Sequence, residues 1–551
     1  MSGRRKSRKF SRLGRRSSAS ATTSLHPTHV FLSGNIVTMD PANPSAEAIA
    51  LAGEQIVAVG KNEEISSLIG PRTETTDLRG RTVLPGFIDC HIHAIWYGLS
   101  LKNIELRHVR SIEEMKKLVS ERTSDKNDWI LGRGWDQERF VEKRFPAKQD
   151  LDEASPEKPV LLERVCGHLA VANSVALEKA GIGPNTPDPA GGIIDRDANG
   201  VPTGILRETA VSLVEKIGPV PSLHDFEDAT LDACQRALEA GLTTVHCIAT
   251  GIESSSSDLE LRALLNLKAE GRLPLRFYVF IPIGQMKTAK ELGLRNGFGD
   301  QWVRFGGVKI FTDGSLGGRT AALEAPYSDD PLNRGMTIYT QEQLDEIVSE
   351  AHRSDLQIAA HAIGDRAIGM VLEAASKARS WVAKKDLRHR IEHASVLNPD
   401  LIRRCSELGI IACVQPRFLL SDFWVVQRLG VARRKFTYPF ASLLRAGVKV
   451  VGGSDCPVEP LDPLDGIAAA VDRPDSEQAV SVEDAIAFYT RNAAYASFEE
   501  NVKGIIAPGR YADLVVLEKD PRKVPTSEIS EIRILITVVA GRIAYRAPAL
   551  N

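Results

Sequence analysis

VLPGFIDCHIH, residues 83–93, is an apolar run of strand length that ends in two histidines. Side chains two residues apart on a strand point to the same side, so the imidazoles of His91 and His93 can reach one metal ion. The pair alone is weak support for a metal site, because a strand histidine can equally be a hydrogen-bonded core residue. The strength of the signal therefore depends on which residues end the other strands of the chain.

Seven further segments have the length and apolar character of strands, and helix-like segments alternate with them between about residues 240 and 490. Repeated βα units with buried strands favour a parallel sheet, and eight strands predict an α/β fold, a (β/α)8 TIM barrel. An open doubly wound sheet is the alternative, although no glycine-rich dinucleotide or phosphate loop supports it. The seven strands are expected at residues 243–247, 277–281, 307–312, 358–361, 391–393, 410–414 and 448–452.

Two helices between these strands have readable boundaries. Thr340 and Gln343 have the spacing of a capping box, which predicts that a helix begins after Thr340. Asn398 as N-cap and Pro399 at the first helical position predict a second helix, which ends before Gly409. Both helices fall between predicted strands, as a (β/α)8 barrel requires.

Short strands separated by turn residues occur at both ends of the chain. They are expected at residues 30–32, 36–38, 49–51 and 56–59, and at 514–517, 534–539 and 543–545. Neither end has enough strands for a stable sheet, so residues 28–82 and 506–551 are expected to form one small β unit beside a barrel of residues 83–505.

Residues from about 100 to 235 interrupt the alternation of strands and helices. They include a hairpin-like piece with an Asn199-Gly200 turn. We expect an insertion after the first barrel strand, placed so that it overhangs the mouth of the active site.

Composition bounds the class of protein. The chain of 551 residues is 43% hydrophobic and 25% charged, which excludes a wholly disordered or fibrous protein. No apolar run approaches the roughly 18 to 20 residues that span a bilayer, so no membrane partner is expected. The seven cysteines are scattered and contain no CxxC pair. This pattern argues against a disulfide scaffold or a thiolate zinc site and fits a reducing cytosol.

The first 25 residues differ from the rest of the chain. They hold eight of the 69 lysines and arginines and no acid, so the remaining 61 bases and 71 acids carry a net charge of -10. Residues 1–27 are poor in apolar side chains and are expected to be a disordered basic tail. Arginine and serine without acids also fit an organelle transit peptide, which leaves organelle targeting open. Phe10 is the only aromatic residue of the tail, so nucleic-acid binding is not expected.

Candidate metal ligands also lie at the C-terminal ends of other predicted strands. They are Lys309 in VKIFTDG, His361 in AHAIGD, His393 in IEHA and Asp455 in GGSDCPV. In a (β/α)8 barrel these ends converge on one face, where catalytic sites lie. Four imidazoles and a carboxylate on that face suit a divalent metal such as zinc. Each residue has a structural rival: any of the histidines can pack in the core, and Lys309 can be a surface or ion-paired lysine.

Several motifs in combination resemble those of the amidohydrolase superfamily, and most of all its YtcJ-like branch, which includes N-substituted formamide deformylases. They are PGFIDCHIH (85–93), VKIFTDGSLGGRTAAL (308–323), HAIGD (361–365), RIEHA (390–394), GGSDCPV (452–458) and APGRYADLVVLEKDP (507–521). The resemblance covers roughly residues 28–548. It implies a barrel beside a β-sandwich built from both chain ends. It also implies two divalent metal ions, such as zinc, bridged by a carbamate on Lys309.

The resemblance also implies a role for each candidate ligand. One carbamate oxygen with His91, His93 and Asp455 would hold the first metal, and the other oxygen with His361 and His393 would hold the second. Carboxylation would make Lys309 an anion, whereas an unmodified lysine has a pKa of about 10.4 and is a poor ligand. Asp455 would accept the proton of the attacking water and then protonate the leaving nitrogen.

Four further residues are expected near the substrate. His168 resembles the insertion-borne histidine of the family, and Trp135 lies in a family motif, GWD, as a hydrophobic wall or a core residue. His246 ends the predicted strand 243–247 and either lines the pocket or packs. Arg319 is expected to bind an anionic group of the substrate or to pair with Asp313.

The leading hypothesis is a cytoplasmic, metal-dependent hydrolase that cleaves a non-peptide carbon–nitrogen bond. Its substrate would be a small-molecule amide or formamide, attacked by metal-activated water. A mononuclear deaminase of the same superfamily, with Lys309 unmodified, is one alternative, and a noncatalytic scaffold that keeps the barrel is another. The resemblance also allows a homodimer.

Overall fold

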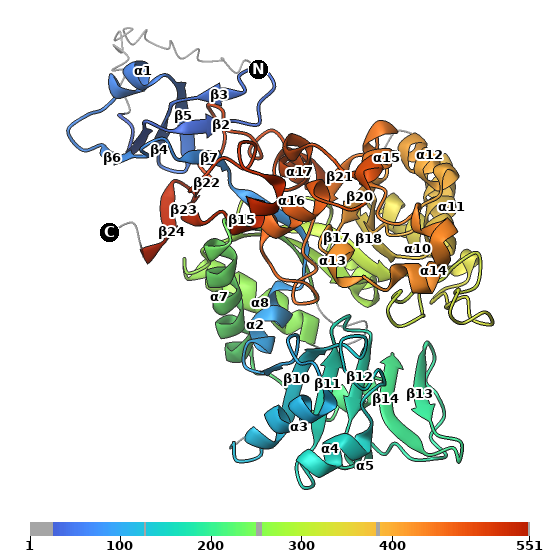
Figure 1. Ribbon diagram of the computed structural model, residues 1–551. Coiled ribbons are helices and arrows are strands. Elements are labelled where there is room, and N and C mark those ends of the chain that lie inside the picture. Colours follow the sequence, from blue (N-terminus) through green and yellow to red (C-terminus); the bar gives the residue numbers. More distant parts are fainter. Residues whose placement is uncertain (1–25, 126–127, 250–255, 382–385, 549–551) are drawn as a thin grey trace, which may run out of the picture.

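The computed structural model describes residues 26–125, 128–249, 256–381 and 386–548. The barrel lies between two additions: the β-rich unit that holds both chain ends, and the insertion (Figure 1). The basic tail predicted for residues 1–27 lies almost entirely outside the described residues. Within the described ranges, no helix has the length and apolar character needed to cross a membrane.

A parallel sheet of eight strands within the described residues forms the barrel, in the order β21-β20-β19-β18-β17-β16-β15-β8. The strands are β8 (Phe87–Ile92), β15 (Leu242–Ile248), β16 (Arg276–Pro282), β17 (Val303–Phe311), β18 (Gln357–Ala362), β19 (Arg390–His393), β20 (Ile411–Val414) and β21 (Val450–Gly452). The two edge strands meet where the main-chain nitrogen of Asp455 donates to the carbonyl of His91 at 2.7 Å and that of His93 donates to Cys456 at 2.9 Å. The predicted (β/α)8 barrel is confirmed.

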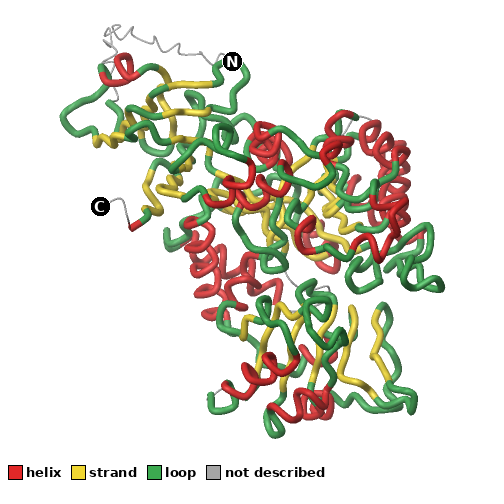
Figure 2. The backbone as a smooth tube through the Cα atoms, in the orientation of Figure 1, coloured by secondary structure: helices red, strands yellow, loops and turns green. Residues whose placement is uncertain are grey.

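Helices surround the barrel, and most of them cover the outside of its strands (Figure 2). The longer ones are α7 (Leu223–Glu239), α8 (Ser256–Ala269), α10 (Gln341–Arg353), α11 (Asp365–Trp381), α12 (Pro399–Leu408), α14 (Val425–Arg434) and α16 (Pro463–Val471). Shorter ones are α9 (Met286–Glu291), α13 (Phe418–Ser421), α15 (Phe440–Arg445), α17 (Val482–Phe488) and α18 (Arg491–Ala496). The capping predictions for α10 and α12 are confirmed, because Thr340 accepts from the Gln343 nitrogen and Asn398 from the Leu401 nitrogen. Gly409 ends α12 with φ of 64°.

The predicted first strand, residues 83–93, is in fact two strands. β7 (Thr82–Pro85) pairs with β2 (Asn35–Val37) and β22 (Leu514–Leu517) outside the barrel, whereas β8 begins the barrel. Gly86 separates them at a close approach, because a Cβ there would lie 2.2 Å from a methyl group of Thr243. Residues 83–93 look like one apolar run in the sequence because β7 and β8 are both buried, although each lies in a different sheet.

Two further sheets contain the strands near the two ends of the chain. The sheet β5-β4-β1-β6 holds N-terminal strands, whereas the sheet β24-β23-β22-β7-β2-β3 combines strands from both ends. The strands not yet given are β1 (His29–Leu32), β3 (Ser45–Ala46), β4 (Ala48–Ala52), β5 (Gln55–Gly60), β6 (Glu74–Asp77), β23 (Ile534–Val539) and β24 (Arg542–Arg546). One apolar core joins the two sheets, with Ile49 and Leu51 from one and Val516 and Val538 from the other. The β-sandwich expected from both ends is therefore present, while its exact limits as a domain stay a prediction.

The insertion is a mixed sheet with helices on both faces, in the order β13-β14-β12-β11-β10-β9. Its strands are β9 (Ile104–Glu105), β10 (Ile130–Trp135), β11 (Val160–Arg164), β12 (Leu169–Ala172), β13 (Gly192–Arg196) and β14 (Pro202–Glu208). Its helices are α3 (Ile112–Glu121), α4 (Lys148–Ala154), α5 (Ser174–Lys179) and α6 (Ser212–Glu215), and α2 (Ala94–Ser100) connects it to β8. The neighbours Leu161 and Leu162 belong to separate apolar cores on opposite faces, as strand periodicity requires. The predicted hairpin is confirmed by the antiparallel pair β13–β14.

Candidate active site

Strand β8 places the two histidines of the opening motif at the mouth of the barrel, His91 on the strand and His93 directly after it. The side chain of His91 is fully buried, and that of His93 is 12% exposed at the start of α2. Asp455 follows β21. This strand meets β8 at the barrel seam, the place where the two edge strands of the eight-stranded sheet come together. Oδ1 of Asp455 lies 3.3 Å from Nε2 of both histidines. These three donor atoms lie within 4.8 Å of one another, which is a spacing that one metal ion can bridge.

Lys309 approaches the same place from β17. Its side chain is buried, and Nζ lies 3.3 Å from Nε2 of His91 and 4.7 Å from the ring centre of Phe311. Among the described residues no carboxylate lies within ion-pair distance of Nζ. Burial accordingly lowers the pKa of Lys309 to about 8, so a substantial fraction of the amine is neutral near physiological pH.

His361 at the end of β18 and His393 at the end of β19 complete the cluster. Their ring centres are 4.5 Å apart, and the ring of His393 lies 5.0 Å from that of His91. Nε2 of His361 is 3.1 Å from the carbonyl of Gly314, and Nδ1 of His393 is 2.8 Å from Oε1 of Gln415. Each imidazole therefore keeps its other nitrogen for a metal. Burial lowers the pKa of His393 to about 3 and that of His361 well below its ordinary value, which favours the neutral form that binds metals.

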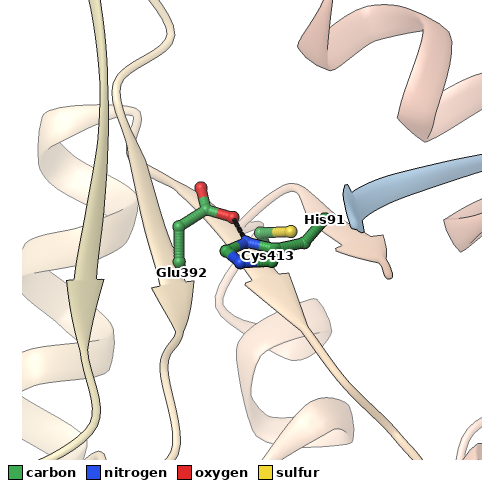
Figure 3. Close-up of side chains that lie close together, drawn as sticks. All are labelled: His91, Glu392 and Cys413. Carbon is green, nitrogen blue, oxygen red and sulfur yellow. Dashed lines mark hydrogen bonds and ion pairs between the residues drawn. The ribbon is translucent and has the colours of Figure 1, made fainter. Parts of the chain in front are cut away.

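A buried carboxylate orients His91 from behind (Figure 3). Glu392 on β19 forms a hydrogen bond with Nδ1 of His91. Burial by itself would raise the pKa of Glu392, but Arg390 and His91 hold it well below its usual range. Sequence reasoning missed this residue, although the two-residue spacing of Arg390 and Glu392 on a strand places both side chains on one face.

Cys413 on β20 lies beside His91 and Glu392, so that the three donor atoms are also within 4.8 Å of one another (Figure 3). This group does not suit a cation, because Arg390 already occupies it. The guanidinium donates to both oxygens of Glu392 at 2.7 Å and to the sulfur of Cys413 at 3.3 Å. The group therefore supports the cluster at the mouth and is not a second metal site.

Asp313 anchors two loops at the mouth and was also missed as a functional position. It is fully buried and accepts hydrogen bonds from the main-chain nitrogens of Ala322, Ile363 and Gly364 at 2.8 to 3.1 Å. Its Oδ1 lies 3.5 Å from Nε2 of His361. Burial raises the pKa of Asp313 to about 7. The residue therefore fixes the loop that comes after His361.

A cavity of about 1510 Å³ opens above the cluster, lined both by the candidate ligands and by the insertion. His168 lines this cavity, with its ring centre 5.3 Å from that of His361 and its Nδ1 2.8 Å from Oε2 of Glu208. Burial by itself would lower the pKa of His168, but Glu208 raises it to about 9. The insertion thus overhangs the mouth and contributes a cationic imidazole to it.

The other three residues expected near the substrate do not line this cavity. Trp135 is fully buried in the core of the insertion, where its indole nitrogen donates to the carbonyl of Leu162 at 2.8 Å. His246 packs inside the barrel, 3.0 Å from Nη1 of Arg390. Arg319 pairs with Asp329 at 2.9 Å, so the expected pairing with Asp313 is wrong. Asp313 is instead satisfied by main-chain donors.

Two residues of the cluster have strained main-chain conformations. The φ angles of His393 and Asp455 are 73° and 58°, in the left-handed region that non-glycine residues rarely adopt. Such strain persists where the surrounding structure fixes it, and it concentrates at functional sites. Here it turns two side chains at strand ends toward a common point.

The barrel, with a cluster of metal-ligand types at its mouth, has the architecture in which barrel enzymes place their active sites. Residues 74–545 match the Amidohydrolase family, Amidohydro_3, and the chain belongs to this family. It is 36% identical to YtcJ of Bacillus subtilis over 94% of this chain and 99% of that protein. It is 27% identical to N-substituted formamide deformylase of Arthrobacter pascens over 94% of this chain and 98% of that enzyme.

A solved structure has the same fold. The crystal structure of an uncharacterized metal-dependent hydrolase from Pyrococcus horikoshii OT3 is similar with a TM-score of 0.74 and 30% identity, covering 91% of this chain and 99% of that one. The expected resemblance to the amidohydrolases is therefore confirmed, and the protein is a hydrolase by family.

Proposed function

We propose that this hydrolase cleaves a non-peptide carbon–nitrogen bond, that of a small-molecule amide or formamide, by attack of water. The proposal rests on the group at the mouth of the barrel. Oδ1 of Asp455 lies 3.3 Å from Nε2 of both His91 and His93, and the buried amine of Lys309 lies beside them. The name of the Arthrobacter relative, a formamide deformylase, supports the formamide as the first class to test.

The donor set suits two divalent metal ions, for which zinc is the proposed identity. His91, His93 and Asp455 would hold one ion, and His361 and His393 the other. The fit rests on the hydrogen bonds behind the cluster: Glu392, Gly314 and Gln415 each engage one nitrogen of an imidazole and leave the other free. When bound, such ions lower the pKa of a water molecule and polarise a carbonyl oxygen.

Lys309 is proposed to carry a carbamate. Its amine is buried and lacks a carboxylate partner among the described residues, and burial lowers its pKa to about 8. The neutral amine can form a bond from nitrogen to the carbon of carbon dioxide and release one proton, which gives an anion with two oxygens. Such an anion is the ligand that an unmodified, protonated lysine cannot be.

Asp455 is proposed to move the proton of the reaction. Burial by itself would raise its pKa, but the neighbouring imidazoles of His91 and His93 hold it well below its usual range, so it is a carboxylate at neutral pH. It can accept the proton of the attacking water and pass that proton to the leaving nitrogen. A water nucleophile needs no serine or cysteine at the site.

A single-metal enzyme, such as a deaminase, is the second candidate. The specific observation in its favour is that only His91, His93 and Asp455 form a compact group at the mouth among the described residues. An unmodified Lys309 with one bound ion would favour it. A noncatalytic scaffold is the third candidate, and it would tolerate loss of the donors.

The test combines metal analysis with a substrate panel. We expect about two zinc ions per chain by elemental analysis, a lysine carbamate in native mass spectra, and hydrolysis of N-substituted formamides, N-acyl amines or cyclic amides. His91→Ala should remove metal and turnover, whereas His224→Ala, which changes a histidine 79% exposed on α7, should change neither. A purified protein without any transition metal would contradict the proposal.

The remaining expectations stay predictions. A cytoplasmic location, the absence of nucleic-acid and membrane partners, and a homodimer are consistent with the sequence. Size-exclusion chromatography with light scattering would test the last of these.

A further inference from the structure

The main chain just after Asp455 is held by two arginines of the insertion. We propose that Arg107 and Arg133 are positioning residues that fix the loop of residues 455–458, so that the insertion aligns Asp455 as well as covering the mouth. This inference rests on the proposed function, because it assigns the alignment to the residue that moves the proton.

Arg107 makes the more extensive contact. It lies just after β9, and its two terminal guanidinium nitrogens donate to the carbonyls of Val458 at 2.7 Å and Pro457 at 2.6 Å. Two parallel donors from one planar guanidinium fix direction as well as distance, which a single donor cannot do. The contact joins the insertion to the loop only two residues beyond Asp455.

Arg133 reinforces the same point from β10. Its guanidinium is buried, and Nη1 donates to the carbonyl of Pro457. The carbonyl of Arg133 also accepts from the main-chain nitrogen of Leu106, which ties the two arginines to one sheet edge. The guanidinium lies 4.9 Å from the ring centre of Trp96, and that ring meets His93 edge-on at 5.5 Å. The insertion thus touches both sides of the barrel seam.

Residues 455–458 form a tight turn, so holding Pro457 and Val458 also restricts the position of Asp455. The main-chain nitrogen of Val458 donates to the carbonyl of Asp455 at 2.7 Å, and the nitrogen of Asp455 donates to His91 at 2.7 Å. With φ of 58° at Asp455, the turn has little conformational freedom once its far end is held. On the barrel side, Arg417 pairs at 3.1 Å with Glu459, the residue directly after the loop, so the end of the loop is held from both directions.

The test is an arginine replacement that keeps the fold. In Arg107→Gln we expect kcat to fall about 10- to 100-fold, because small misplacements of reacting groups have effects of this size. The KM should change less than about twofold, whereas a substrate-contact role at the cavity wall would raise KM. Arg107→Lys keeps one donor and should recover part of kcat. The control is Arg144→Gln, which removes an exposed pair with Asp150 in the same insertion.

A second readout separates this inference from the proposed function. Hydrogen exchange of the main-chain amides of residues 454–459 should become faster in Arg107→Gln and stay unchanged in Arg144→Gln, whatever the substrate. Unchanged exchange together with unchanged kcat would overturn the inference. If the unmodified protein hydrolyses nothing in the panel but exchange still becomes faster, the proposed function fails and the positioning role stands. Arg133→Gln is tested in the same two assays and should give the same changes. If Arg133→Gln does not fold, the result for Arg107→Gln alone tests the inference.

Discussion

The imidazole of His91 and the carboxylate of Glu392 form a hydrogen bond in which both side chains are fully buried. Arg390 donates to both oxygens of the same carboxylate, so Glu392 is ionised and acts as an acceptor. Nδ1 of His91 must then be the protonated nitrogen, which leaves Nε2 as the lone-pair donor beside Asp455 and Lys309. The barrel interior thus fixes the tautomer of a candidate ligand before any metal binds.

Glu392→Gln should weaken zinc binding about 10- to 100-fold, since loss of such a supporting carboxylate has effects of this size on metal affinity. Competition with a chelating dye measures the affinity. The matched control is Glu407→Gln, which removes an exposed ion pair with Arg403 and should leave the affinity unchanged. An unaltered zinc affinity in Glu392→Gln would show that the hydrogen bond does not support the metal site.

Asp455→Asn should lower kcat by about 10²- to 10⁴-fold, the usual contribution of a positioned acid or base. Asparagine keeps an oxygen donor, so most of the metal should remain, but it cannot accept the proton of water. Steady-state kinetics and elemental analysis of the same preparation check both parts. Asp386→Asn, at an exposed position, serves as the control. Retained turnover would exclude the proton role of Asp455.

The stability of the fold should fall in acid partly through His389, outside the site. Its Nδ1 accepts from the Ile358 nitrogen at 3.0 Å. Burial, together with His352, lowers the pKa of His389 from 6.5 to about 3. Between these values the unfolded chain binds more protons, so stability present above about pH 6.5 is lost as the pH falls toward 3.

Urea unfolding at about pH 7, 5.5 and 4 measures this loss as the free energy of unfolding. His389→Asn keeps an acceptor for the Ile358 nitrogen but cannot titrate, so its stability should fall less between the highest and lowest pH. Equal losses in the two proteins would exclude His389 as a source of the acid sensitivity.

Gly453→Ala should destabilise the barrel seam. A Cβ at Gly453 would lie 2.6 Å from the main-chain nitrogen of His91, and overpacking of this kind costs about 1–3 kcal/mol. The matched control is Gly369→Ala in α11, where the nearest atom would be a methyl group of Leu401 at 3.8 Å. The control should gain up to about 1 kcal/mol, because alanine favours a helix over glycine. Thermal unfolding distinguishes the two, and a stabilised Gly453→Ala would contradict the close contact.

The barrel could be predicted from sequence because its strands are short apolar runs and several end in a polar residue. The same logic predicted that one set of side chains meets at the mouth of the barrel: His91, His93, Lys309, His361, His393 and Asp455. It failed at residues 83–93, where hydrophobicity alone cannot show that β7 and β8 belong to different sheets. Burial is the same in both, and only the pairing partners differ.

The supporting residues were harder to find, for physical reasons. Glu392 and Asp313 act through contacts with distant segments, which no local pattern reports. A tryptophan such as Trp135 suits a pocket wall and an apolar core equally well. Only the packing of the insertion shows that it lies in the core. Arg319 has several acids near it in the sequence, including Asp313 and Asp329, and the fold of its loop selects Asp329.

The pairing of β7 with β22 has a consequence for biosynthesis. Thr82 lies opposite Leu517 and Pro85 opposite Leu514, so the partner of β7 is made only after the whole barrel has been translated. Until then one edge of β7 lacks its partner strand, and unpaired strand edges are prone to aggregation. Translation that stalls before residue 514 therefore leaves this edge of β7 without its partner strand.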